Sequence, residues 1–200
     1  WILLALISSP TLAQEVFINE IHYDNTGGDV DEAIEIAGPA GTDLSGWSIV
    51  LYNGSGGAVY NTRTLSGSIP DSGNGFGFVT ETYPANGIQN GAPDGIALVN
   101  NGTLIQFLTY EGTFVAVGGP ADGVSGTDIG VLEAGTDPVG FSIQLSGTGT
   151  VYSDFTWQAP STANFSTINT GQSFGSDPID PVDPADPVDP VDPVDPADQV

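Results

Sequence analysis

Residues 17–54, FINEIHYDNTGGDVDEAIEIAGPAGTDLSGWSIVLYNG, contain three short apolar runs separated by segments rich in Gly, Asp and Asn. The runs cover residues 16–22, 33–37 and 47–52, and none shows the 3.6-residue repeat of an amphipathic helix. Short runs bounded by turn-forming residues are typical of β-strands. The stretch therefore predicts three strands at the start of the fold.

The rest of the chain repeats this pattern. Six further strands are predicted at residues 58–65, 76–81, 95–99, 103–110, 140–145 and 151–157. Turns rich in Gly, Asn or Ser at 53–57, 100–102 and 146–150 join neighbouring strands. Such tight connections favour antiparallel pairing, because a parallel crossover usually needs a helix. The sequence therefore predicts an all-β fold of antiparallel strands, either a β-sandwich or a barrel.

Alternation within the strands identifies the residues that should face the core. Ile34 and Ile36 share one face, which places Glu35 either outward or at a special site. Ser142 and Gln144 alternate with apolar neighbours and should point away from the core. The other residues predicted to be inward are Trp47, Ile49, Leu51, Phe141, Ile143, Leu145, Phe155 and Trp157. Core packing is preferred to a ligand platform for the aromatic residues, since large apolar side chains are usually buried.

The charge of the chain restricts its partners. It has 25 acidic residues, one Lys or Arg (Arg63) and a formal net charge of −24. Eight of the acids lie after residue 176, so 17 belong to the part that precedes it. Binding to nucleic acid depends on Lys and Arg, and an acidic surface repels anionic membranes. We therefore expect no direct binding to nucleic acid or membrane, whereas divalent cations and basic partners suit this surface.

Both ends of the chain differ in composition from its middle. Residues 1–13, WILLALISSPTLA, are typical of the apolar and cleavage regions of a secretory signal, and predict a secreted, extracellular protein. Residues 14–176 form the predicted β-rich domain. Residues 177–200 repeat Asp-Pro every third position, which favours an extended polyproline II linker and indicates a further domain beyond it. A disordered acidic tail is the alternative. The chain has no cysteine, which excludes disulfides and thiolate metal sites.

The sequence contains no complete catalytic motif. The only histidine, His22, lies on the first predicted strand with no nucleophile motif beside it, so a structural role is expected. Asp71-Ser72-Gly73 matches half of an aspartic protease site, but that mechanism needs two carboxylates sharing a proton. The segment is better explained as a turn, and the sequence predicts no catalytic residues.

The acidic turn at residues 24–32 is the one candidate metal site. Asp24, Asp29, Asp31 and Glu32 lie within nine residues, together with Asn25 and Thr26. Carboxylate and carbonyl oxygens are the ligands that calcium takes, so these four acids are predicted as possible calcium ligands. The alternative is a solvated hairpin in which Asp and Asn only stabilise the turn.

The opening stretch resembles the lamin tail domain family. The shared features are an I-N-E-I strand (18–21), an E-x-I-E-I strand (32–36) and the D-L-S-G-W segment (43–47). Later segments at 87–99, 105–112, 147–157 and 169–174 are similar to the version found at the N-terminus of large secreted bacterial nucleases, in which an endonuclease/exonuclease/phosphatase domain follows. The chain departs from the family pattern at Ala33 and at residues 37–39. The resemblance covers about residues 15–175 and implies an immunoglobulin-like β-sandwich.

Three functions follow as hypotheses. The first is a non-catalytic accessory module that positions a downstream extracellular nuclease of the same chain. The alternative is an adhesion or matrix-binding module of a cell-surface protein, carried on the Asp-Pro stalk. A metal-dependent hydrolase within this segment is disfavoured, because basic residues that would stabilise a charged transition state are nearly absent.

Overall fold

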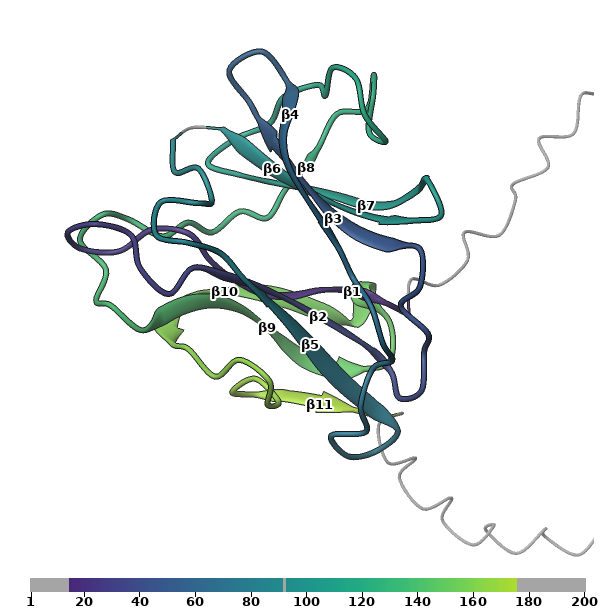
Figure 1. Ribbon diagram of the computed structural model, residues 1–200. Helices are drawn as coiled ribbons and strands as arrows, with labels where there is room; N and C mark the ends of the chain where they lie inside the picture. Colours follow the sequence, from purple (N-terminus) through teal and green to yellow (C-terminus); the bar gives the residue numbers. More distant parts are fainter. Residues whose placement is uncertain (1–14, 92, 176–200) are drawn as a thin grey trace, which may run out of the picture.

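The computed structural model describes residues 15–91 and 93–175, which form an all-β sandwich of two sheets (Figure 1). The predicted signal segment 1–13 and the Asp-Pro segment 177–200 lie outside the described residues. The described residues form no α-helix, and their one helical turn is the 3-10 turn Tyr152–Asp154. The all-β sandwich predicted from the sequence is therefore confirmed.

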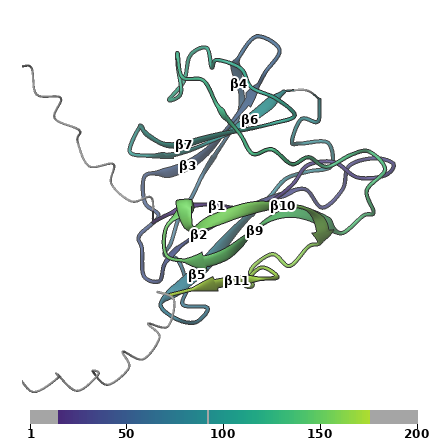
Figure 2. The same ribbon diagram turned by 180° about the vertical axis from the view of Figure 1, so that it is seen from behind.

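The first sheet is the lower layer in Figure 1 and contains six strands. They are β1 (Phe17–His22), β2 (Ala33–Pro39), β5 (Phe76–Thr82), β9 (Phe141–Gly149), β10 (Phe155–Thr162) and β11 (Gln172–Phe174). Their order is β10-β9-β1-β2-β5, and β11 pairs with β9 in parallel. Figure 2 shows this layer from behind, with β11 at its lower border. The three strands predicted from residues 17–54 are thus divided between the two sheets: the first two are β1 and β2 of this sheet, and the third belongs to the other sheet.

The second sheet, the upper layer in Figure 1, contains five strands. They are β3 (Trp47–Asn53), β4 (Ala58–Thr64), β6 (Asp94–Asn100), β7 (Thr103–Tyr110) and β8 (Thr127–Asp128). Their order is β4-β3-β6-β7-β8, and only the short β8 pairs in parallel, with β7. All nine predicted strands are present, and the antiparallel prediction holds for every pair except those made by β8 and β11.

The prediction for the last strand pair is partly wrong. The turn expected at 146–150 lies largely inside β9, which continues to Gly149, and β10 begins only at Phe155 rather than at 151. The Asp154 carboxylate accepts the N–H groups of Thr150 (2.8 Å) and Val151 (3.0 Å), which moves the turn to residues 150–154. A side chain that satisfies backbone donors can place a turn independently of glycine.

A β-bulge in β1 determines which residues of the I-N-E-I segment face the core. Ile18 pairs with Ile36 and Glu20 with Glu35, so Asn19 is an extra residue in the ladder. Strict alternation would place Ile18 and Ile21 on opposite faces of the sheet. With the bulge both isoleucines are fully buried in the core between the sheets. The adjacent Glu20 opposes Glu35 on the outer face.

The sandwich has three apolar clusters. The largest lies between the sheets and includes the predicted core residues Ile34, Ile36, Trp47, Ile49, Leu51 and Ile143. A second covers the outer face of the second sheet around Tyr52 and Phe107. A third lies around Phe17 and Phe174 and includes the predicted Leu145 and Phe155. The second and third clusters cover apolar side chains on the outer faces of the two sheets. Strands that are buried on both faces are therefore nearly continuous apolar runs in the sequence.

Two groups of residues differ from the burial prediction. Phe141 and Trp157 are only half-buried: Trp157 lies on the edge strand β10, and Phe141 is the first residue of β9. Ser142 and Gln144 point away from the core, as predicted, but they are buried on the outer face of the sheet. The loop that follows β10, residues 163–171, donates hydrogen bonds into this outer face and contributes to a polar layer there.

Candidate functional site

The acidic turn connects β1 to β2, and two of its four carboxylates bind the loop at residues 83–91. Glu32 is fully buried, and its two oxygens accept the N–H groups of Gly87 (2.6 Å) and Ile88 (3.0 Å). Asp29 is also buried and accepts the side-chain amide of Asn90 at 2.9 Å. Burial is the largest cause that raises the pKa of Glu32, and the two N–H groups oppose it. These two residues therefore hold a neighbouring loop.

The other two predicted ligands lie apart from that contact. Asp31 is exposed and has a φ of 62°, in the left-handed region that Asp and Asn tolerate better than most residues. Asp24 is half-buried, and burial followed by the nearby charge of Asp29 raises its pKa, although Asn90 opposes this. Within residues 15–91 and 93–175, no group of three or more His, Cys, Asp or Glu side chains is placed to hold a metal ion. Calcium binding at Asp24, Asp29, Asp31 and Glu32 stays a prediction.

Asn25 organises the acidic turn from within. Its side-chain amide donates to the carbonyl oxygens of Thr26 (3.0 Å) and Gly28 (3.1 Å), and its Oδ1 accepts the N–H of Val30 at 3.0 Å. One buried amide thereby satisfies three backbone groups of the turn, as Asn does in many irregular loops. The turn is thus ordered by its own side chains.

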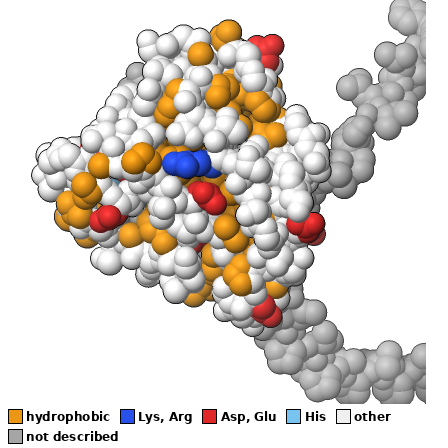
Figure 3. All heavy atoms as spheres, viewed as in Figure 1, with side chains coloured by type: hydrophobic (Ala, Val, Ile, Leu, Met, Phe, Trp, Pro, Cys, Tyr) orange, Lys and Arg blue, Asp and Glu red, His pale blue; other side chains and the backbone are white. Residues whose placement is uncertain are grey.

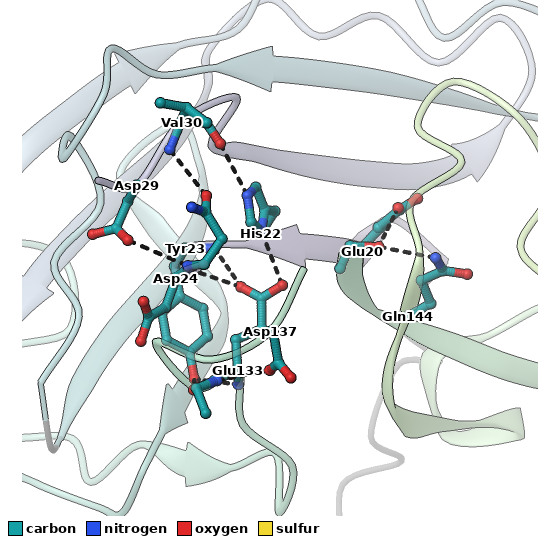
Figure 4. A network of polar contacts seen from close by, with 12 residues as sticks. Glu20, His22, Tyr23, Asp24, Asp29, Val30, Glu133, Asp137 and Gln144 are labelled. Atoms are coloured by element: carbon teal, nitrogen blue, oxygen red, sulfur yellow. Dashed lines mark hydrogen bonds and ion pairs between the residues drawn. The ribbon is translucent and has the colours of Figure 1, made fainter. Parts of the chain in front are cut away.

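His22 lies beside this turn in a buried ion pair with Glu133 (Figure 4). Its Nδ1 is 2.9 Å from Glu133 Oε1, and its Nε2 is 3.0 Å from the carbonyl oxygen of Val30. The two side chains are 2% and 1% exposed. A carbonyl oxygen only accepts, so Nε2 must carry a hydrogen. The ring therefore has one nitrogen left for the contact with Glu133.

Glu133 binds backbone groups as well as the ring. Its Oε2 accepts the N–H groups of Tyr23 (2.6 Å) and Asp24 (3.0 Å), so Oε1 is the oxygen that meets His22 Nδ1. A protonated His22 donates from both nitrogens in this arrangement. Burial by itself lowers the pKa of His22, but the hydrogen bond and charge of Glu133 outweigh it, and the net shift is upward. This buried contact suits the structural role expected of His22 from the sequence, which stays a prediction.

A second pair of buried carboxylates lies on the outer face of the first sheet. Glu20 and Glu35 stand opposite each other on β1 and β2. Glu20 Oε1 accepts the Ser142 hydroxyl (2.6 Å) and the N–H of Asn164 (3.0 Å). Burial raises the pKa of Glu20. Glu35 proves to occupy the special site that the sequence left open, because it is buried beneath the loop 163–171.

The pKa of Glu35 is shifted further than that of Glu20. Its Oε2 accepts the Thr80 hydroxyl at 2.9 Å and the N–H of Ser166, and its Oε1 accepts the Asn19 amide at 3.1 Å. Burial raises its pKa to about 7, against these hydrogen bonds, and the charge of Glu20 adds to the rise. Glu35 therefore takes up a proton near neutral pH, with burial as the main cause and the charge of Glu20 as a smaller one.

The buried acids of the described residues follow one rule. Each of the six accepts at least one backbone N–H from a loop or turn. These acids and their donors are Glu20 with Asn164, Asp29 with Asn25, Glu32 with Gly87 and Ile88, Glu35 with Ser166, Asp94 with Gly54, and Glu133 with Tyr23 and Asp24. In a chain with one Lys or Arg, backbone amides supply the positive ends that buried carboxylates need.

Sequence reasoning missed Glu133 and the donors on the loop 163–171. His22 and Glu133 are 111 positions apart, and no local pattern relates them. A signal was present for Glu20, because a charged residue inside an otherwise apolar strand segment must find partners if it is buried. The predicted turn at Asp71-Ser72-Gly73 is confirmed, since Asp71 Oδ1 accepts the N–H of Gly73 at 2.9 Å.

Comparison with known proteins gave no match to any family model, curated protein or solved structure. The resemblance to the lamin tail family therefore remains an expectation that rests on the motifs alone. Among the described residues, no helix has the length and apolar character needed to cross a membrane.

Proposed function

We propose that the sandwich is a non-catalytic interaction module of a secreted multidomain protein, and that it positions an extracellular nuclease. The observation that carries this proposal is the state of His22. A general base needs a free ring nitrogen within reach of substrate. In His22 both nitrogens are engaged, one with Glu133 and one with Val30, and the ring is 2% exposed. The buried carboxylates are likewise bonded to backbone amides.

The distribution of charge supports a role other than binding the phosphate backbone. Arg63 is the one cationic side chain in Figure 3, and its guanidinium carbon lies 5.1 Å from the centre of the Tyr83 ring. A single cation stacked on a tyrosine provides little counterion release on a polyanion. Any nuclease activity of the parent protein is then expected from a different domain. The resemblance to the lamin tails of secreted nucleases and the Asp-Pro segment support this arrangement.

The proposal is tested on residues 15–175, which contain the complete apolar core described above. The purified segment is incubated with supercoiled plasmid in Mg²⁺, Mn²⁺ or Ca²⁺, beside a known nuclease as a positive control. We expect no nicking or linearisation. Metal-dependent cleavage that co-purifies with the wild-type segment and disappears in His22→Gln would contradict the proposal.

The identity of the neighbouring domain is tested by extending the coding sequence past Val200. A nuclease domain there supports the proposed arrangement. A surface anchor or further β-sandwich repeats would instead support the adhesion or matrix-binding alternative.

A further inference from the structure

A pocket of about 470 Å³ lies at the edge of the second sheet where β7 and β8 end. The residues that line it are Glu111, Gly112, Asp128, Gly130, Val131 and Leu132. Each of them is exposed or half-buried, so the lining is accessible to a molecule that arrives from solvent. The volume lies within the range of ligand-binding sites.

The parallel pairing of β7 and β8 brings two carboxylates to this pocket. Parallel strands run in the same direction, so both strands end at the same side of the sheet. Asp128 is the last residue of β8 and pairs with Thr109 of β7. Glu111 comes directly after Tyr110, the last residue of β7. The two acids therefore line one pocket although they lie on different segments of the chain.

One oxygen of each carboxylate is held by the protein. Glu111 Oε1 accepts the Tyr23 hydroxyl at 3.2 Å, and the buried Tyr23 ring stacks on Tyr110 with 4.2 Å between the ring centres. Asp128 Oδ1 accepts the N–H of Gly130 at 3.0 Å. Among the described residues, none donates to Glu111 Oε2 or Asp128 Oδ2. Both carboxylates are thus positioned before a ligand arrives, which reduces the ordering that binding requires.

An exposed apolar side chain lies in the same pocket as these carboxylates. Leu132 is 49% exposed, and its neighbour Val131 is half-buried. A ligand that suits both parts of the lining has a positive charge and an apolar stem. Arginine and lysine side chains have this composition, because their methylene groups pack on apolar surface while the charged group binds polar partners.

The surrounding charge favours a cationic ligand over an anionic one. Neither Lys nor Arg lines the pocket, and Arg63, the single such residue of the chain, lies on β4 at the opposite edge of the second sheet. A divalent cation suits the site less well. Calcium takes about six to eight oxygen ligands, whereas the pocket offers two carboxylates, each with one oxygen already engaged.

We propose that this pocket binds an arginine or lysine side chain of a basic partner peptide. The inference rests on the proposed function, because it gives the non-catalytic interaction module the chemistry of its partner. The cationic group donates to Glu111 and Asp128, and the methylene stem packs on Leu132. Since the site is solvent-exposed and holds a single side chain, we expect a dissociation constant on the order of 1 mM for a short peptide.

The test is a ¹⁵N-HSQC titration of the whole chain, at about 20 mM NaCl so that charges are weakly screened. The probe is a blocked tripeptide with arginine between two leucines, and the matched probe carries citrulline, which has a similar shape without the charge. We expect the arginine peptide to shift the resonances of Gly112, Asp128 and Gly130 saturably. It should bind about tenfold more tightly than the citrulline peptide.

Three results of this titration would overturn the inference. One is the absence of a saturable shift at the pocket up to about 20 mM arginine peptide. Another is equal affinity for the arginine and citrulline peptides. The third is saturation of the same resonances by CaCl₂ at a lower concentration than by the arginine peptide, because the pocket would then hold a metal ion.

Two pairs of variants locate the binding. Asp128→Asn removes a carboxylate of the pocket, and its control Asp122→Asn removes another exposed carboxylate, which likewise accepts an N–H group, from Gly118. Leu132→Ser removes the apolar contact, and its control Val139→Ser changes a residue outside the pocket that is 50% exposed. Asp128→Asn should weaken binding of the arginine peptide about fivefold and Leu132→Ser about threefold, while both controls leave it unchanged.

The variants also separate a defined pocket from attraction by net charge alone. An equal loss of affinity in Asp128→Asn and Asp122→Asn would show that the peptide responds only to the total charge, and would contradict the proposed site. Unchanged affinity in both Asp128→Asn and Leu132→Ser would do the same. DNA cleavage by residues 15–175 would contradict the proposed function without affecting this titration.

Discussion

His22 and Glu133 show how a chain with almost no cations accommodates buried charge. Isolated buried ions are costly, and one ion pair repays that cost only when the remaining hydrogen-bonding positions are also satisfied. Here the His22 ring uses both nitrogens, and Glu133 accepts two backbone N–H groups besides its contact with the ring. The pair therefore joins β1, the acidic turn and the loop before β9 into one unit.

Glu133→Gln should destabilise the fold by about 3 kcal/mol, because it leaves a buried histidine without its counter-charge and weakens two hydrogen bonds to the backbone. Urea denaturation monitored by tryptophan fluorescence measures the change in the free energy of unfolding. Glu15→Gln is the control, since Glu15 is exposed, and it should change stability by less than about 0.5 kcal/mol. A loss below about 1 kcal/mol in Glu133→Gln would contradict the assigned pair.

Glu35 should make the protein more stable in mildly acidic than in alkaline solution. Its pKa is about 7 in the folded state, where burial is the main cause, and 4.5 in the reference state. Between these values the folded state binds more protons than the unfolded state, so stability is greatest at low pH and falls as the pH rises through 7. His22, whose pKa is also raised, contributes in the same direction, because its stabilisation is lost above its folded pKa.

The expected loss from Glu35 alone is roughly 3 kcal/mol between pH 5 and pH 8. Urea denaturation at the two pH values measures it. Glu35→Gln removes the titration and should flatten the dependence, while Glu15→Gln should leave it unchanged. A wild-type protein that is equally stable at both pH values would contradict the buried state of the pair.

The strands were predictable from sequence because their runs are short and bounded by turn residues, and all nine lie where the pattern placed them or within a few residues. β8 and β11 escaped prediction, since two- and three-residue strands carry no periodicity of their own. The pairing of β11 depends instead on Phe174, which packs against Phe17 and Phe76. Tertiary contacts of this kind are absent from any local window.

The bulge in β1 also lay beyond sequence prediction. The I-N-E-I pattern does not indicate that two isoleucines three positions apart lie on the same face of the strand. Deleting Asn19 removes the extra residue and leaves Ile18 and Ile21 two positions apart, so both keep the core face of a ladder that becomes regular. The deletion removes the polar contacts of Asn19 but no core contact, so the variant should still fold, with a loss of about 1–3 kcal/mol.

Asn19→Ala is the matched variant for this prediction. It keeps the chain length and the bulge but removes the amide contacts to Glu35 and Gln172. We expect a loss of about 1–3 kcal/mol, with a cooperative unfolding transition retained. Circular dichroism and urea denaturation compare the two variants. A deletion variant that fails to fold while Asn19→Ala folds would contradict a ladder that becomes regular without Asn19.

The candidate site was predicted only in part. The sequence located the acidic turn, and the structure places all four of its acids there, with Asp29 and Glu32 bonded to a loop more than 50 positions away. Patterns of residue type located the carboxylates, but their partners are backbone N–H groups, which every residue other than proline possesses. Because a backbone N–H is the same in nearly every residue type, no sequence motif can identify which one is the donor.

Charge over the chain as a whole should make the fold sensitive to salt. Residues 15–175 carry 17 acids against one arginine and one histidine, so their self-repulsion is weakened by screening. We expect the melting temperature to rise by several degrees between about 10 mM and 500 mM NaCl.

Calcium binding at the acidic turn is tested by the same measurement. The hypothesis for Asp24, Asp29, Asp31 and Glu32 requires the melting temperature to rise more with CaCl₂ than with MgCl₂ at equal ionic strength. That increment should disappear in Asp31→Asn and persist in Asp43→Asn, an exposed acid outside the turn. Equal melting curves in the two salts would remove calcium from the turn and leave Asn25 as its organising group.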